Sequence, residues 1–481
     1  MTPIIATITV LGYLALLFSV SYFTGRRADN AGFFVGGRQS AWLVVAIATI
    51  GSTISGVTFV SVPGMVQANH FAYLQMVLGF IVGQFLIAFV LVPLYYRLKL
   101  VSIYEYLKQR FGTSSYRTGA WFFFVSKMLG ASVRLFLVCL TMQLLIFQPL
   151  GMPFWLNVAL TVLAVWLYTF RGGVKSVIWT DLLKTFCLVF SVVLCIYFIA
   201  RGLGLDWGGV WSAIWGSDMS ETFFWDDVND KRFFPKQFLA GVFTMIATSG
   251  LDQDLMQRNL SCRNSSESRK NMMVSAVMQF VVISLFLMLG VLLYLFAAHV
   301  GLQCRGDELF TLVATGGYLP MAVGILFLVG LVSAAFSAAG SALTALTTSF
   351  TVDIMQADRS NEAATARTRK RVHAGMALTM AGVIIVFNLL NNTSVIDAVY
   401  ILASYTYGPL LGLFAFGIFS KRTVRDRWVP LVAVAAPLLC WVIDRHSVQW
   451  FNGYQFSYEL LIMNALFTFL GLCLLMRRPA A

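Results

Sequence analysis

The sequence predicts an all-α membrane protein with about 13 transmembrane helices. Hydrophobic residues make up 59% of the 481 residues and charged residues only 11%, whereas about a quarter of the residues of a soluble domain are charged. Apolar runs of about 20 residues, long enough to cross a bilayer, recur along almost the whole chain. Because no hydrophilic gap could hold a soluble domain, we expect a single membrane domain over 1–481.

The expected spans follow these apolar runs in order. The first lies near 4–24 and lacks both a preceding basic segment and a following cleavage site, so we expect a retained helix rather than a signal peptide. The next five spans lie near 40–66, 71–96, 118–147, 153–169 and 175–200. After a Trp-rich gap at 201–235, seven more lie near 236–255, 271–300, 319–354, 372–390, 394–419, 428–443 and 456–476.

Positive charges fall into alternate gaps between these spans. Most of the 34 Lys and Arg residues follow spans 1, 3, 5, 7, 9 and 11 or lie in the tail. The positive-inside rule therefore predicts a multi-pass protein of the cell (inner) membrane with its N-terminus outside and its C-terminus in the cytoplasm. The net charge of +13 is spread over cytoplasmic loops, so no nucleic-acid partner is expected.

Small and polar residues interrupt the second span, namely Gly51, Ser52, Thr53, Ser55, Gly56, Thr58 and Pro63. Unwinding there would free backbone carbonyls to bind a cation or a polar substrate. Close helix packing through small residues is the alternative explanation.

The seventh span is interrupted in the same way at Thr248, Ser249 and Gly250, five spans later. Two interrupted helices at corresponding positions of successive five-helix units indicate an inverted-repeat transporter with its site near mid-membrane. We expect the first repeat over 40–200 and the second over 236–422. An extra N-terminal helix within 1–27 and two C-terminal helices within 423–481 complete the expected architecture.

The ninth span carries a row of hydroxyl side chains. Ser337, Ser341, Thr344 and Thr348 recur at three- and four-residue steps and so share one helix face. Hydroxyl oxygens suit a monovalent cation that has shed its water, but they suit ordinary helix packing equally well.

Five segments together resemble the sodium:solute symporter family over nearly the whole chain: YEYLKQRFG at 104–112, RGGVKSVIWTDLLKTF at 171–186, GLDQDLMQRNLS at 250–261, SFTVDI at 349–354 and YGPLLGLFAFGIFSKR at 407–422. The resemblance implies a leucine-transporter-like core and inward uptake of a small solute, driven by sodium through alternating access. The implied partners are a small-molecule solute, sodium as the coupling ion and the lipid bilayer. No other cofactor and no obligate protein partner is expected.

The resemblance also implies a sodium site at Gly51, Ile54, Ala334, Ser337 and Ala338. Ala338 stands where family members usually have Ser or Thr. The lost hydroxyl should weaken sodium binding unless water, Ser333 or Ser341 compensates.

Asp181 matches an aspartate that in relatives assists sodium release or forms a second cation site with a hydroxyl matching Ser341. Lys184 replaces the family's glutamine and shares a helix face with Asp181. Its ammonium could take the place of a second sodium, or the side chain could extend toward the cytoplasm.

Lys127 and Arg134 lie within the fourth span, with Arg134 near its middle, where an unpaired charge costs several kcal/mol. The partner of Arg134 is therefore either Asp181, Asp252 or Asp254 or the carboxylate of a transported solute, which a guanidinium binds through two parallel hydrogen bonds.

We expect the solute to bind at the two helix breaks and at the fourth span, through Ser52, Thr53, Ser55, Thr58, Arg134, Thr248 and Ser249. A carboxylate or amino-acid-like solute is favoured. A sugar or other neutral solute is the alternative, although Thr53, Thr58 and Thr248 replace the Asn, Gln and Tyr of the family's sugar carriers. Proton coupling or cation-independent transport stays open because of Ala338 and Lys184.

Other classes of function receive less support from the sequence. Four histidines lie far apart near span ends, where we expect loop or interface roles, and no catalytic motif is present. The selectivity-filter run typical of a channel is not found in the sequence. An output domain, which a transporter-like sensor would need, is not found either. The sequence predicts a transporter and not an enzyme.

Overall fold

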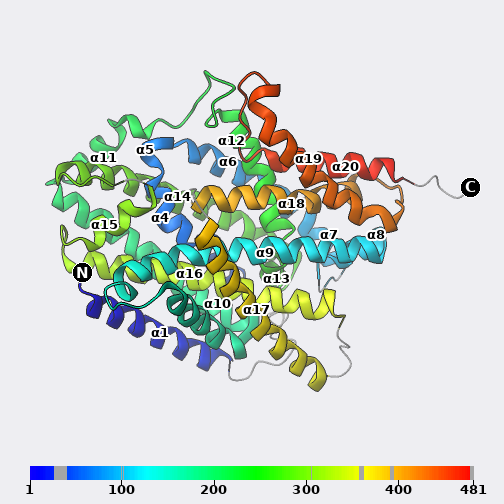
Figure 1. Ribbon diagram of the computed structural model, residues 1–481, viewed down its shortest axis with the longest axis horizontal. Helices are drawn as coiled ribbons and strands as arrows, with labels where there is room; N and C mark the ends of the chain where they lie inside the picture. Colours follow the sequence, from blue (N-terminus) through cyan, green and yellow to red (C-terminus); the bar gives the residue numbers. More distant parts are fainter. Residues whose placement is uncertain are drawn as a thin grey trace, which may run out of the picture.

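A computed structural model describes residues 1–25, 41–98, 100, 102–304, 306–356, 362–390 and 395–476, without the side chains of 24, 25, 171–177, 337, 362–365, 396 and 397. The described chain is built from helices, with two isolated bridges and no strand (Figure 1). The expected all-α membrane architecture is confirmed. Within the described ranges, nine helices are long and apolar enough to cross a membrane, or ten if α3 and α4 form one span.

The first half of the chain contains α1 (Pro3–Gly25), α3 (Trp42–Thr53), α4 (Gly56–Gly64), α5 (Val66–Asn69), α6 (Ala72–Leu86), η2 (Ile87–Leu91), α7 (Val92–Arg97), α8 (Glu105–Arg110), α9 (Thr113–Met142), η3 (Gln143–Phe147) and α10 (Phe154–Gly202). The 49 residues of α10 cover both the fifth and the sixth expected span. At 1.5 Å per residue they amount to about 74 Å of helix, more than twice the thickness of the hydrocarbon core.

The second half contains α11 (Trp207–Trp215), η4 (Asp218–Ser220), α12 (Phe234–Met245), η5 (Ile246–Gly250), α13 (Gln253–Asn259), α14 (Ser265–His299), η6 (Gly306–Glu308), α15 (Leu309–Thr315), α16 (Met321–Ser349), η7 (Phe350–Ile354), α17 (Glu362–Leu390), α18 (Val395–Phe419), η8 (Asp426–Trp428), α19 (Val429–Trp450) and α20 (Leu460–Leu474). Helix α16 packs against α9, α10, α3 and α4, and α9 runs beside α18 (Figure 1).

The second span breaks between α3 and α4, which meet at an angle of 58°. Ile54 and Ser55 adopt extended backbone angles, with ψ of 103° and 173°. A side chain at Gly51 would lie 2.3 Å from Oγ1 of Thr185, so α3 approaches α10 closely, while Gly56 lies against Leu331 of α16. The break is therefore held between α10 and α16.

The seventh span breaks between η5 and α13. Its last helical turn is a π-turn, and Asp252 then leaves the helix with ψ of 120°. The carboxylate of Asp252 accepts hydrogen bonds from the backbone N–H groups of Asp254 at 2.9 Å and Leu255 at 3.4 Å. Asp252 thus caps the start of α13, as aspartate commonly does at this position.

Candidate functional site

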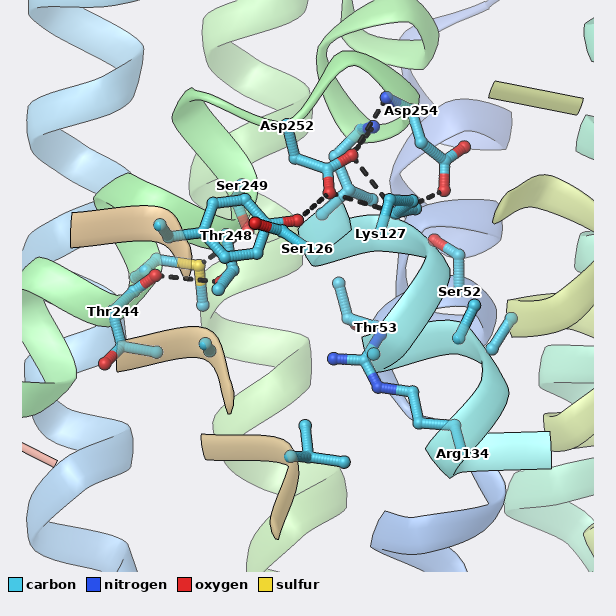
Figure 2. A pocket seen from close by; sticks show the side chains of 18 of the residues that line it. Ser52, Thr53, Ser126, Lys127, Arg134, Thr244, Thr248, Ser249, Asp252 and Asp254 are labelled. Carbon is cyan, nitrogen blue, oxygen red and sulfur yellow. Dashed lines mark hydrogen bonds and ion pairs between the residues drawn. The ribbon is translucent and has the colours of Figure 1, made fainter. Parts of the chain in front are cut away.

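The two breaks border a small internal cavity of about 100 Å³ (Figure 2). It lies between α3, α6, α9, the broken span α12–η5–α13, α14, α16 and α18. Five of the residues expected to bind solute line it: Ser52, Thr53, Arg134, Thr248 and Ser249. Ser55 and Thr58 do not line it, so the structure does not bring these two expected residues to the cavity.

A pair of tyrosines separates this cavity from a larger one of about 530 Å³. Tyr400 lines the small cavity and Tyr73 the large one, and their hydroxyl oxygens are 2.6 Å apart. The large cavity is bordered by Lys231 and Arg232, from the loop that the charge pattern places outside. The tyrosine pair thus closes the small cavity toward that loop.

Arg134 extends from α9 into the small cavity (Figure 2). Within the described part of the chain no hydrogen bond or ion pair to its guanidinium is formed. The alternative of an internal carboxylate partner is not supported, because Asp181, Asp252 and Asp254 all pair with other cations.

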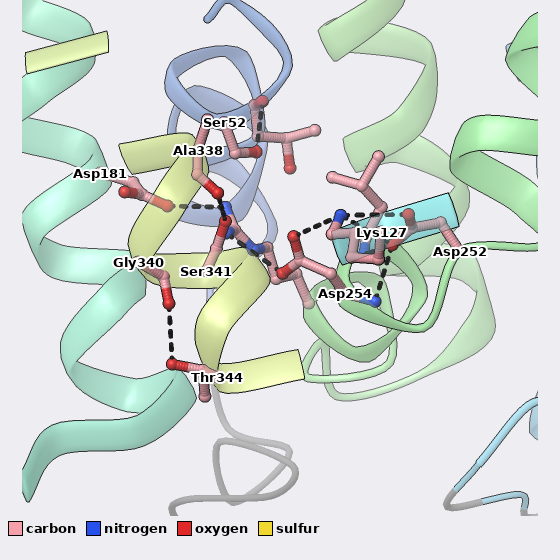
Figure 3. Close-up of polar contacts among 12 residues, drawn as sticks. Ser52, Lys127, Asp181, Asp252, Asp254, Ala338, Gly340, Ser341 and Thr344 are labelled. Atoms are coloured by element: carbon pink, nitrogen blue, oxygen red, sulfur yellow. Dashed lines mark hydrogen bonds and ion pairs between the residues drawn. The ribbon is translucent and has the colours of Figure 1, made fainter. Parts of the chain in front are cut away.

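Lys127, two helical turns from Arg134, forms ion pairs with two carboxylates (Figures 2 and 3). Its Nζ lies 3.0 and 3.1 Å from the two carboxylate oxygens of Asp252 and 3.0 Å from Oδ2 of Asp254. The hydroxyl of Tyr407 on α18 also donates to Asp252, at 2.7 Å. These contacts join α9 and α18 to the second break.

Asp181 anchors the other end of the same network. It accepts from Nζ of Lys184 at 3.3 Å and from Nη1 of Arg258 at 2.6 Å, and Nη2 of Arg258 lies 3.3 Å from Asp254. The network therefore runs from Lys184 to Asp252 through alternating charges, and Figure 3 shows Asp181, Asp254, Lys127 and Asp252 within it. Three cations face three carboxylates, so the buried charges balance.

Two expectations need correction here. Lys184 is 1% exposed, with Nζ 4.9 Å from the centre of the Tyr168 ring, so it does not extend toward the cytoplasm. Arg258 follows the seventh expected span, in a gap that the charge pattern assigns to the cytoplasm, but it is also 1% exposed. The four-residue spacing of Asp254 and Arg258, which puts them on one helix face, was the available signal.

The residues of the implied sodium site lie at the first break and on α16. Gly51 is in the last turn of α3, where carbonyls lack helical partners. Ile54 is in the break, and Ala334 and Ala338 are buried on α16, with Ala338 lining the cavity. The side chain of Ser337 lies outside the described residues.

The other hydroxyls of α16 have mixed roles. Ser341 lines the cavity and donates to the carbonyl of Ala338 at 3.2 Å. Ser333 lies beside Tyr13 of α1 and does not line the cavity, and its buried hydroxyl has no hydrogen-bond partner among the described residues. Thr344 and Thr348 donate to carbonyls of their own helix, which agrees with the packing explanation for these two residues.

His373 is buried rather than solvated and lies at a helix interface. Its Nδ1 is 2.9 Å from the hydroxyl of Thr347 on α16, and its Nε2 is 3.0 Å from that of Thr169 on α10. It ties α17 to both helices and does not line the cavity.

The sequence model of the sodium:solute symporter family matches residues 33–426. The sodium/sialic acid symporter NanT of Aliivibrio fischeri is 25% identical over 474 residues, which cover 92% of this chain and 88% of that protein. The sodium/sialic acid symporter SiaT of Proteus mirabilis is 26% identical, with 86% and 84% covered. The human sodium/iodide cotransporter is 26% identical, with 82% and 62% covered.

Among solved structures, a Na⁺-coupled sialic acid symporter in a substrate-bound outward-open state superposes with a TM-score of 0.84. It is 19% identical and covers 98% of this chain and 97% of its own. A nucleobase-cation-symport transporter in a closed conformation gives a TM-score of 0.54 at 12% identity, with 92% and 94% covered. These likenesses support the fold.

Proposed function

Because this chain belongs to the sodium:solute symporter family, whose members couple solute transport to sodium, we propose that its solute is a small organic anion that carries a carboxylate. Arg134 carries this proposal. A guanidinium in the middle of a membrane span is costly without a counter-charge, and a carboxylate supplies one through two parallel hydrogen bonds. A solute that carries one is therefore the natural partner of Arg134.

The charge balance of the cavity supports a monovalent anion. The other charged side chains that line it are Lys127, Asp252 and Asp254, which pair with one another and with Arg258. Arg134 is therefore the uncompensated charge among the described lining residues. The three relatives described above are also named for anionic solutes, sialic acid and iodide.

The cavity volume favours a small solute in this conformation. About 100 Å³ is well below the roughly 300–1,000 Å³ of pockets that enclose drug-sized ligands. A solute of a few heavy atoms fits without rearrangement, whereas a sugar acid requires the cavity to widen. Separation of Tyr73 and Tyr400 would provide such widening.

We place sodium at Gly51, Ile54, Ala334, Ser337 and Ala338, between the first break and α16. A sodium ion at this site would contact both the first break and α16, which belong to different repeats. It would therefore favour the conformation in which these two elements lie close together. We further propose that Lys184, with Asp181 and beside Ser341, replaces a second cation, so that one sodium accompanies each solute. We also propose that the protein resides in the inner membrane with its N-terminus outside, and that it is not an enzyme.

Thermal stability of the purified protein tests this function, because a ligand bound to the folded state raises it. Pyruvate, N-acetylneuraminate, iodide and glucose would each be added in sodium and in potassium at equal ionic strength. We expect stabilisation that requires both sodium and an organic anion. It should be lost in Arg134→Gln but kept in Arg201→Gln, whose side chain is exposed. Stabilisation by glucose that survives Arg134→Gln would contradict the proposal.

A further inference from the structure

Helix α9 presents two cations to the same cavity. Lys127 and Arg134 are seven residues apart, which puts them on one helix face about 10 Å apart along the axis. Gly130 and Ala131 line the cavity between them. A side chain at Gly130 would meet no atom within 4 Å, so open space adjoins α9 between the two cations.

The two cations differ in what holds them. No described residue bonds to Arg134, whereas Lys127 is held by carboxylates from the second break. Those carboxylates have other partners as well. Asp252 also accepts from the N–H groups of α13 and from Tyr407, and Asp254 also pairs with Arg258.

This difference matters when α13 moves away from α9. Asp252 would keep its cap bonds and Asp254 would keep Arg258, because these partners lie on α13 itself. Lys127 would lose both carboxylates and become an unpaired buried cation, which is strongly unfavourable. Such a movement therefore needs an anion to replace Asp252 and Asp254.

We propose that Lys127 is a second binding site for the solute, occupied after Arg134 on the release path. The carboxylate of the solute replaces Asp252 and Asp254 at the ammonium as α13 separates from α9. Opening without an anion leaves Lys127 unpaired, so the site also disfavours opening of the empty carrier. This inference rests on the proposed carboxylate solute and on release past α13.

The simplest competing role for Lys127 is a lock that only holds the cavity closed. The two roles predict opposite effects when the charge pair is removed. Removal of a lock leaves solute exchange equal or faster, whereas removal of a binding site on the path makes exchange slower.

The experiment compares wild-type protein with Lys127→Gln/Asp252→Asn, which removes one charge of each sign and retains a capping side chain. Exchange of radiolabelled pyruvate and N-acetylneuraminate is followed in sodium-loaded proteoliposomes, and equilibrium binding of the same anions in detergent. We expect a Kd within about three-fold of wild type and an exchange rate at least about ten-fold lower. Lys127→Arg keeps the positive charge and should retain most of the wild-type exchange rate. Lys421→Gln, at an exposed position, should change neither the Kd nor the exchange rate.

Exchange that is equal to or faster than wild type would overturn the inference in favour of a lock. Should the first variant be unstable, Lys127→Gln/Asp254→Asn applies the same test and leaves Asp252 with its cap bonds and Tyr407. Failure of the proposed function appears separately, since wild-type protein would then bind neither anion.

Discussion

Asp181, Asp252 and Asp254 each pair with a cation other than Arg134. The pairing of Asp181 with Lys184 follows from their three-residue spacing, which is local. Asp252 and Asp254 are far in sequence from both Lys127 and Arg134, so the sequence could not say which cation they meet. In the structure both carboxylates pair with Lys127, which leaves Arg134 available for a solute.

Ser337 is the only side-chain hydroxyl among the five residues proposed for sodium. We expect Ser337→Ala to raise the sodium concentration for half-maximal uptake at least about ten-fold, equivalent to about 1.4 kcal/mol of lost binding. Ser333→Ala is the matched control, because Ser333 faces α1 and should keep the wild-type sodium dependence. Undiminished sodium stimulation in Ser337→Ala would exclude the proposed site.

Lys184→Gln restores the residue typical of the family. Removal of the ammonium takes away one of the positive charges beside Asp181 and leaves the contact with Arg258, which should let a second sodium bind. We expect sodium activation of uptake to become steeper and the sodium-to-solute flux ratio to rise from about one to about two. Lys184→Arg should keep the wild-type ratio. A flux ratio of two in wild-type protein would refute the replacement of a second cation.

At the scale of helices, hydrophobic run length was a reliable guide. Each expected span has a helical counterpart, and both breaks lie where Gly, Ser and Thr interrupt an apolar run. The π-turn before Asp252 and the path of α10 could not be read from hydropathy, because both depend on which helices are neighbours.

Helices α6 and α12 touch through backbone atoms. A side chain at Gly79 would lie 2.2 Å from the carbonyl oxygen of Phe238, and one at Gly241 would lie 2.1 Å from that of Met76. Small residues allow such close approach between membrane helices. We expect Gly79→Ala to destabilise the protein by about 1–3 kcal/mol, measured as a lower melting temperature in detergent.

Gly382→Ala on α17 is the matched control, since its added methyl group would meet no atom within 4 Å. The control should melt at or slightly above the wild-type temperature, because alanine favours helix over glycine. Equal melting of both variants would show that α6 and α12 do not pack this closely.

For the whole molecule, the charge pattern predicts an orientation that labelling can test. Cys304 lies between α14 and η6, on the side expected to be outside, and Lys421 lies beyond α18 on the cytoplasmic side. In a chain without other cysteines, Cys304 should react with an impermeant maleimide in intact cells. Lys421→Cys should react only after permeabilisation. The opposite labelling pattern would show that the protein is inserted in the opposite orientation.

The same experiment has an expected pH dependence. Partial burial and the nearby Glu308 raise the pKa of the Cys304 thiol. Because the thiolate is the reactive form, labelling of Cys304 should accelerate as pH rises above neutrality. Rates that are flat across this range would show that Cys304 is not in its described environment.

The small size of the cavity also separates anions that can be transported from anions that would act as inhibitors. In this conformation its volume of about 100 Å³ limits the size of an anion that can bind while Tyr73 and Tyr400 stay in contact. A bulkier carboxylate that still reaches Arg134 would hold Tyr73 and Tyr400 apart and so prevent closure. Such compounds would act as blockers rather than cargo, and the longest transported homologue in a graded series of carboxylates would measure how far the cavity can expand.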